Sequence, residues 1–159
     1  MTPIETAIKM TLDRWYGSVA SLDKVLNVLT DEQLLKETAP GKNRGIYLLG
    51  HLVAVHDDML TLLDLGEKQH PELTEPFIKL ADNVATELPS VAVLRDYWSG
   101  QNALLREKFD QFTADQWFEK HTAVSAEDFA KEPHRNKLNI IISRTSHLQY
   151  HTGQIALLK

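Results

Sequence analysis

Apolar residues recur every three or four positions in four long stretches of the chain, which is the spacing of helices that bury one face. The first stretch opens with Thr2, Pro3 and Glu5. Thr2 is suited to cap a helix, Pro3 to its first position and Glu5 to the third position of a capping box. Apolar residues then keep to one face as far as Leu29. We therefore expect a long first helix.

Three further helices are predicted by the same spacing and by their end signals. The second covers about 46–65 and stops at Gly66, because glycine tolerates the left-handed conformation that often ends a helix. The third starts near Ser90, and the fourth covers about 136–158. No segment shows the sustained alternation of a half-buried strand. The pattern therefore predicts an all-α protein.

A short internal echo relates the two halves of the chain. The stretch 29–34 after the first helix and the stretch 112–117 after the third each place a threonine three residues before a glutamine. Each can cap one short helical turn. We expect a four-helix bundle with short extra helical turns, formed by a single domain over 1–159. The region 67–88 is expected to be a long crossover, and its role cannot be deduced from the sequence.

Composition narrows the function classes. The 159 residues include 17 basic and 22 acidic side chains, a net charge of −5, which disfavours nucleic acid as a partner. No cysteine is present, so a metal site must use nitrogen and oxygen ligands. The longest apolar-rich segment, 46–65, contains several charged residues and histidines, and no basic leader precedes an apolar stretch. We expect no membrane association and a cytoplasmic location.

Two of the seven histidines are placed to bind one ligand together. His147 and His151 lie four residues apart, about 40° around a helix axis, so both imidazoles project from one face. Arg144 and Gln154 extend this polar stripe beside the apolar face of the same helix. The simpler alternative is a pair of neutral histidines on a partly exposed surface. A metal ion or a bound anion would satisfy the stripe if it is buried.

His51 is the candidate third ligand, because apolar residues surround it on both sides. The alternative is a hydrogen-bonded core histidine. Gly50 is costly in the middle of a helix and indicates close packing or a site. His56 lies about 140° around the helix from His51 and is expected at an edge of the bundle, and Asp58 lies about 10 Å along the axis, too far for the same ion. The other histidines are expected at the surface: His70, His121 and His134.

These segments together resemble the DinB/YfiT-like metalloenzyme family, the DNA-damage-inducible DinB superfamily. The resemblance rests on Leu-Gly-His-Leu at 49–52 and on His-Leu-Gln-Tyr-His-Thr-Gly-Gln at 147–154, and it spans nearly the whole chain. It implies a bundle with a long crossover, a homodimer, and a nickel, zinc or similar divalent ion held by His51, His147 and His151. Relatives in this family include thiol-dependent transferases and isomerases.

Two classes of function follow from this resemblance. Three imidazoles leave further coordination positions open, which is typical of a catalytic metal site acting on a small-molecule substrate by thiol transfer or hydrolysis. A thiol would have to come from a low-molecular-weight cosubstrate, since the chain has none. Arg144 could anchor its carboxylate or pair with a nearby acid, and Gln154 could orient a ligand histidine. The alternative is a non-catalytic, stress-related metal or ligand binder, whereas DNA binding is opposed by the acidic charge.

Overall fold

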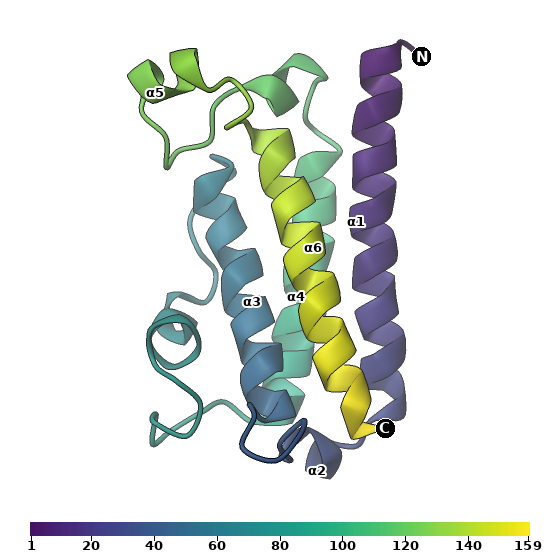
Figure 1. Cartoon of the computed structure of the whole chain (residues 1–159), viewed down its shortest axis with the longest axis vertical. Helices are drawn as coiled ribbons and strands as arrows, with labels where there is room; N and C mark the ends of the chain where they lie inside the picture. Colours follow the sequence, from purple (N-terminus) through teal and green to yellow (C-terminus); the bar gives the residue numbers. More distant parts are fainter.

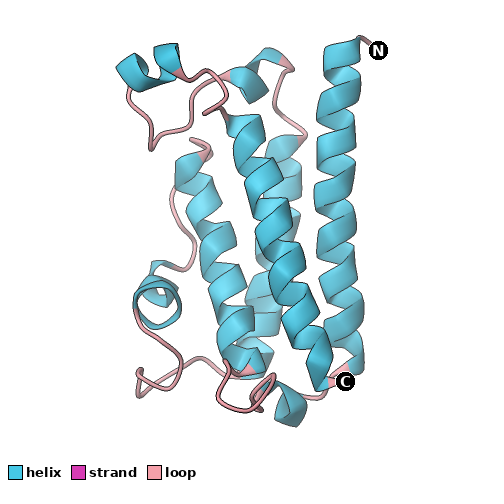
Figure 2. Ribbon diagram, in the orientation of Figure 1, coloured by secondary structure: helices cyan, strands magenta, loops and turns pink.

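The computed structural model describes residues 1–159, and its regular structure is helical, as predicted. Its four long helices are α1 (Pro3–Val28), α3 (Gly45–Leu62), α4 (Val91–Phe109) and α6 (Lys137–Ile155). The shorter elements are α2 (Asp31–Leu34), η1 (Pro71–Leu73), the π-helical turn η2 (Glu75–Lys79), η3 (Asp115–Phe118), α5 (Ala126–Lys131) and η4 (Ala156–Leu158). Figure 2 shows helices joined by loops, with no sheet.

Local end signals set most of the helix boundaries. The Thr2 and Glu5 side chains form the predicted capping box at the start of α1, and Thr30 forms another at α2. Helix α4 starts where the spacing predicted, and the Ser90 side chain caps it. The second helix ends at Leu62, three residues before the predicted end, because the chain already turns at Asp64 with a φ of 59°. Side-chain caps therefore identified helix starts better than glycine identified this helix end.

The four long helices form a bundle in which α1 and α6 run one way and α3 and α4 run the other (Figure 1). The closest helix pairs are α1 with α6 and α3 with α4. A long crossover leads from the end of α3 back along the side of the bundle to the start of α4. The two halves that resemble each other in sequence therefore pack against one another, and each depends on the other for its core.

The core is one continuous cluster of 28 buried apolar side chains to which all four long helices contribute. Trp15 and Leu22 come from α1, Leu52 from α3, Leu105 from α4 and Ile141 from α6, and each is at most 1% exposed. Burial of this apolar surface is the main stabilising contribution to the fold. No helix combines the length and apolar character needed to cross a bilayer.

The crossover is fastened to α3 by buried contacts. The carboxylate of Asp57, 1% exposed, accepts the backbone N–H groups of Gln69 and His70 at 2.8 Å each. Further along the crossover, the fully buried Phe77 ring lies against Gly50, where a β-carbon would overlap it. The glycine in the middle of α3 therefore allows η2 to approach the helix closely, next to His51.

Candidate metal centre

Three histidines from two antiparallel helices converge on the side of the bundle that faces η2. His51 lies in α3, and His147 and His151 lie one turn apart in α6. The Nε2 atom of His147 is 3.1 Å from the Nε2 atoms of both His51 and His151. No two of the three ligand atoms lie more than 4.8 Å apart, and all three residues are half-buried. The sequence prediction that these three side chains meet is confirmed.

The hydrogen bonds of two of these rings determine which nitrogen carries the proton. The Nδ1 atom of His51 is 2.7 Å from the carbonyl oxygen of Phe77, which can only accept, so this Nδ1 carries the proton. The Nδ1 atom of His151 is 2.6 Å from Oε1 of Gln154, whose amide nitrogen donates to the hydroxyl of Tyr150. The Nε2 atoms of His51 and His151 therefore each carry a free lone pair, and both lone pairs are directed at the same point.

Burial keeps His147 and His151 neutral. Removal from water, then the neighbouring charges of His151, His51 and Arg144, lower the pKa of His147 to about 4. Burial also lowers the pKa of His151, with the charge of His51 acting in the same direction. Near neutral pH these two imidazoles are neutral, with a lone pair on one ring nitrogen, which is the form that binds a metal ion.

The donor set is compatible with a divalent transition-metal ion. Metal–nitrogen bonds of about 2.0–2.1 Å place neighbouring ligand nitrogens about 3 Å apart, close to the 3.1 Å separations in the cluster. Three converging nitrogens cannot satisfy one another, because a proton on Nε2 of His147 could serve only one of its two neighbours. Imidazole ligands suit zinc and nickel, among other ions, and no cysteine competes for them.

The crossover completes this cluster through Phe77, which the sequence analysis did not identify. Its carbonyl oxygen orients the His51 ring, while its side chain occupies the space that Gly50 leaves free. Tyr47 stacks parallel to the same imidazole, with ring centroids 6.4 Å apart. Gly50 was the only sequence signal for this contact, and it could not indicate which residue approaches it.

Arg144 and Gln154, the other predicted site residues, both lie beside the cluster. Gln154 contacts His151 as described. Arg144 is half-buried and its Nε atom is enclosed without a protein partner. Burial lowers the pKa of this guanidinium, whereas the charge of Asp58 raises it. Asp58 itself pairs with Lys68 at 2.5 Å and takes no part in the cluster.

The remaining histidines do not join the cluster, and two of them are more buried than expected. His56, expected at an edge, is 0% exposed, because α1 and α4 close over it with the indoles of Trp15 and Trp98. His121, expected at the surface, is 9% exposed. Its loop is attached to the end of α3 by the hydrogen bond from the Thr122 N–H to the Leu62 carbonyl. The other two lie at the surface or close to it: His70, stacked on Tyr97, and the exposed His134.

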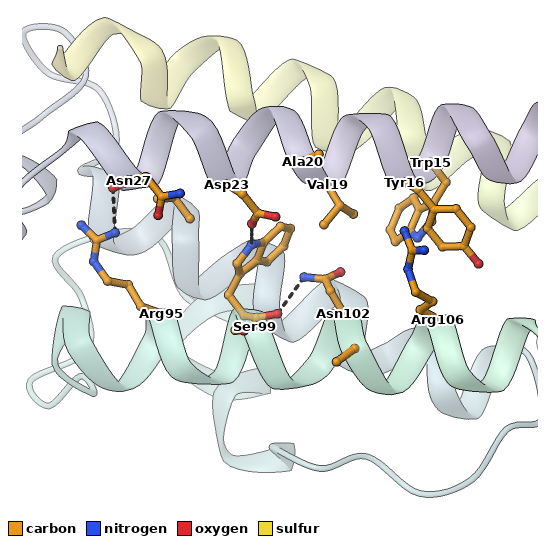
Figure 3. Close-up of a pocket in the computed structure, with 13 residues that line it drawn as sticks. Trp15, Tyr16, Val19, Ala20, Asp23, Asn27, Arg95, Ser99, Asn102 and Arg106 are labelled. Carbon is orange, nitrogen blue, oxygen red and sulfur yellow. Dashed lines mark hydrogen bonds between the residues drawn. The ribbon is translucent and has the colours of Figure 1, made fainter.

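The principal hollows of the surface lie away from the three histidines. One hollow of about 540 Å³ runs between α1 and α4, on the opposite side of the bundle (Figure 3). Its polar groups are largely paired within the protein, as where the Trp98 indole N–H donates to Asp23 at 2.7 Å. The four other principal hollows are not lined by the cluster either. The candidate metal centre therefore lies outside these five hollows.

Comparisons with known proteins agree with this architecture. A crystal structure described as the conserved protein of locus from Enterococcus faecalis is similar in fold, with a TM-score of 0.66 and 16% sequence identity over 94% of this chain and 93% of that one. No curated protein sequence matches the chain. Residues 14–155 match the DinB superfamily, a span that includes all three clustered histidines. By this match over most of its length, the chain belongs to the DinB superfamily.

Proposed function

We propose that this protein binds one divalent metal ion, nickel or zinc, through the Nε2 atoms of His51, His147 and His151. The observation that carries the proposal is the convergence of these atoms, with both outer rings held so that Nε2 carries a lone pair. Membership of the DinB superfamily supports the same conclusion. Fixed partners at Nδ1 are typical of histidines that bind metals.

We further propose that the site is catalytic and acts on a small molecule, by thiol transfer or hydrolysis. A divalent ion with an open position can lower the pKa of a coordinated water or thiol and can polarise a carbonyl group. The histidines hold one face of such an ion and leave the solvent side accessible. Arg144, one turn before His147, has its Nε enclosed, and its terminal N–H groups would bind a substrate carboxylate. Any thiol must come from a low-molecular-weight cosubstrate, because the chain has no cysteine.

The first experiment measures metal content after purification without added metal or a metal-affinity tag. We expect about one ion per chain in the wild type and little in His151→Ala, because two imidazoles hold an ion far less tightly than three. His134→Ala is the matched control, since His134 is exposed and does not belong to the cluster. Equal metal in the wild type and in His151→Ala would refute the site.

A non-catalytic metal or ligand binder is the second candidate function, favoured by the absence of the three histidines from every principal hollow. The two candidates differ in whether the ion accepts an outside ligand. We expect the visible spectrum of the cobalt-loaded protein to change when a small thiol is added, and metal-dependent turnover when such thiols are screened with electrophiles. An unchanged spectrum and no turnover would favour the binder. The homodimer implied by the family remains a proposal, which light scattering tests.

A further inference from the structure

One of the three clustered histidines lacks an orienting partner in the protein. His51 and His151 each direct Nδ1 at an oxygen, whereas the Nδ1 atom of His147 is enclosed and contacts no protein acceptor. If Nε2 of His147 binds an ion, its proton must lie on Nδ1. Histidines that bind metals almost always donate this second N–H. A buried N–H without an acceptor would cost about 1–3 kcal/mol, so an acceptor is expected close by.

His56 offers a buried acceptor whose protonation is fixed by its neighbours. The Nδ2 amide of Asn102 donates to the carbonyl of Trp98 at 2.7 Å, in the groove shown in Figure 3, so its Oδ1 must be the atom that faces His56. The Nδ1 atom of His56 lies 2.9 Å from this oxygen and therefore carries the proton. The opposite nitrogen, Nε2, is then a lone pair, and it too is enclosed without a protein partner.

His56 and Arg144 lie at neighbouring levels of α3 and α6, on the same side of the contact between His51 and His147. Helices α3 and α6 are antiparallel, so a step from His51 to His56 of about 7.5 Å and a step from His147 back to Arg144 of about 4.5 Å run in the same direction. Burial, followed by the charges of His147, Arg144 and His51, lowers the pKa of His56 to about 3, so these groups lie within electrostatic reach of its ring. The Nε–H of Arg144 is a further enclosed donor without a partner.

These three atoms match the hydrogen-bonding capacity of one water molecule. The N–H groups of His147 and Arg144 supply two donors, and Nε2 of His56 supplies one acceptor. Water accepts two hydrogen bonds, and a buried water in a protein typically makes about three bonds to groups that otherwise lack partners. Direct contact is not required, because a bridging water orients groups nearly as well as a direct bond.

We propose that His56 is a positioning residue for the metal centre, which holds the Nδ1–H of His147 through one internal water shared with Arg144. The proposal rests on metal binding at the three histidines and extends it into the core. The chain of contacts runs from His147 through the water to His56, and then through Asn102 to the backbone of α4. The metal centre is thereby linked to α4, which packs closely against α3 and supplies no ligand of its own.

The test compares zinc affinity among variants, measured at neutral pH by competition with a chromophoric chelator. His56→Phe keeps a ring between the two indoles but has no acceptor, and we expect its affinity to fall about tenfold or more. His56→Gln places an amide oxygen near the original Nε2 and is expected to bind within a few-fold of the wild type. The control is Trp98→Phe, which perturbs the same part of the core without altering the acceptor and should bind like the wild type.

A second variant keeps the proposal testable if His56→Phe folds poorly. Asn102→Leu retains the histidine ring but removes its Nδ1 partner, so the proton can move to Nε2 and the acceptor is lost. We expect a several-fold loss of affinity here as well. Wild-type affinity in both His56→Phe and Asn102→Leu would overturn the proposal, as would an equal loss in Trp98→Phe, which would indicate a packing effect.

Proton resonances of the cobalt-loaded protein separate positioning from general loosening. Each histidine bound through Nε2 retains an exchangeable Nδ1–H, so the wild type should give one such signal for each of the three ligands. In His56→Phe the signal of His147 alone should exchange faster, whereas equal changes in all three would contradict the proposal. If the wild type binds no metal, the proposed function fails; if it binds metal and His56→Phe is unaltered, only this inference fails.

Discussion

Replacement of Gly50 by alanine tests whether the approach of the crossover to α3 is as close as the structure describes. A β-carbon at this position would overlap three atoms of the Phe77 ring. The ring is 0% exposed and belongs to the continuous apolar core. Alanine in a helix interior is favoured over glycine by about 1 kcal/mol, but overpacking a tight core costs about 1–3 kcal/mol. The two effects oppose each other, so a control at an open position is needed.

Gly17 in α1 and Gly100 in α4 supply that control, because a β-carbon at either position would meet nothing within 4 Å. Alanine at these sites should raise the free energy of unfolding by up to about 1 kcal/mol. Gly50→Ala should therefore be less stable than Gly17→Ala by about 1–3 kcal/mol. For a chain of this size each kcal/mol corresponds to a shift of about 2–4 °C in Tm.

Urea unfolding and thermal unfolding of the metal-free proteins measure this difference directly. A Gly50→Ala variant as stable as Gly17→Ala would show that the Phe77 ring does not occupy the space in front of Gly50. The orientation of His51 by the Phe77 carbonyl would then lose its structural basis. Gly50→Ala should also lower the metal affinity, because a displaced Phe77 can no longer fix the Nδ1 proton of His51.

Two further predictions concern the histidines and their partners. The pKa of His56 is about 3 in the folded protein and about 6.5 in the unfolded chain. Its contribution to the free energy of unfolding is therefore present above pH 6.5 and is lost as the pH falls towards 3. Between pH 7 and pH 4 this loss is on the order of 3 kcal/mol. Urea unfolding at several pH values should give a flatter profile for His56→Phe than for the wild type, and parallel profiles would contradict the burial of a neutral ring. Gln154→Leu removes the acceptor of the His151 Nδ1–H and should lower zinc affinity about 10–100-fold, whereas an unchanged affinity would exclude this orienting role.

The helices and their starts could be predicted because their signals are local. Capping by Thr2, Thr30 and Ser90 depends on residues three positions away, and each of these caps is present. The meeting of His147 and His151 likewise follows from helical spacing alone. The prediction that His51 joins these two histidines required the resemblance to a family in addition, since the helix that carries His51 lies far away in sequence.

Contacts that depend on tertiary packing could not be predicted in this way. The position of His56 around α3 was evaluated correctly relative to His51, but whether that face is exposed depends on the packing of Trp15 and Trp98 from two other helices. Phe77 lies 26 residues from the histidine that it orients, in a proline-containing segment without apolar periodicity. No local signal connects such residues.

The pairing of the helices also determines what a bound ion would hold together. The layer formed by α1 and α6 supplies two of the three histidines, and the layer formed by α3 and α4 supplies the third. An ion held by all three joins the two layers, so the layers cannot separate while all three metal–nitrogen bonds are intact. Saturating metal should therefore stabilise the assembled bundle and protect the core amides of both layers from hydrogen exchange.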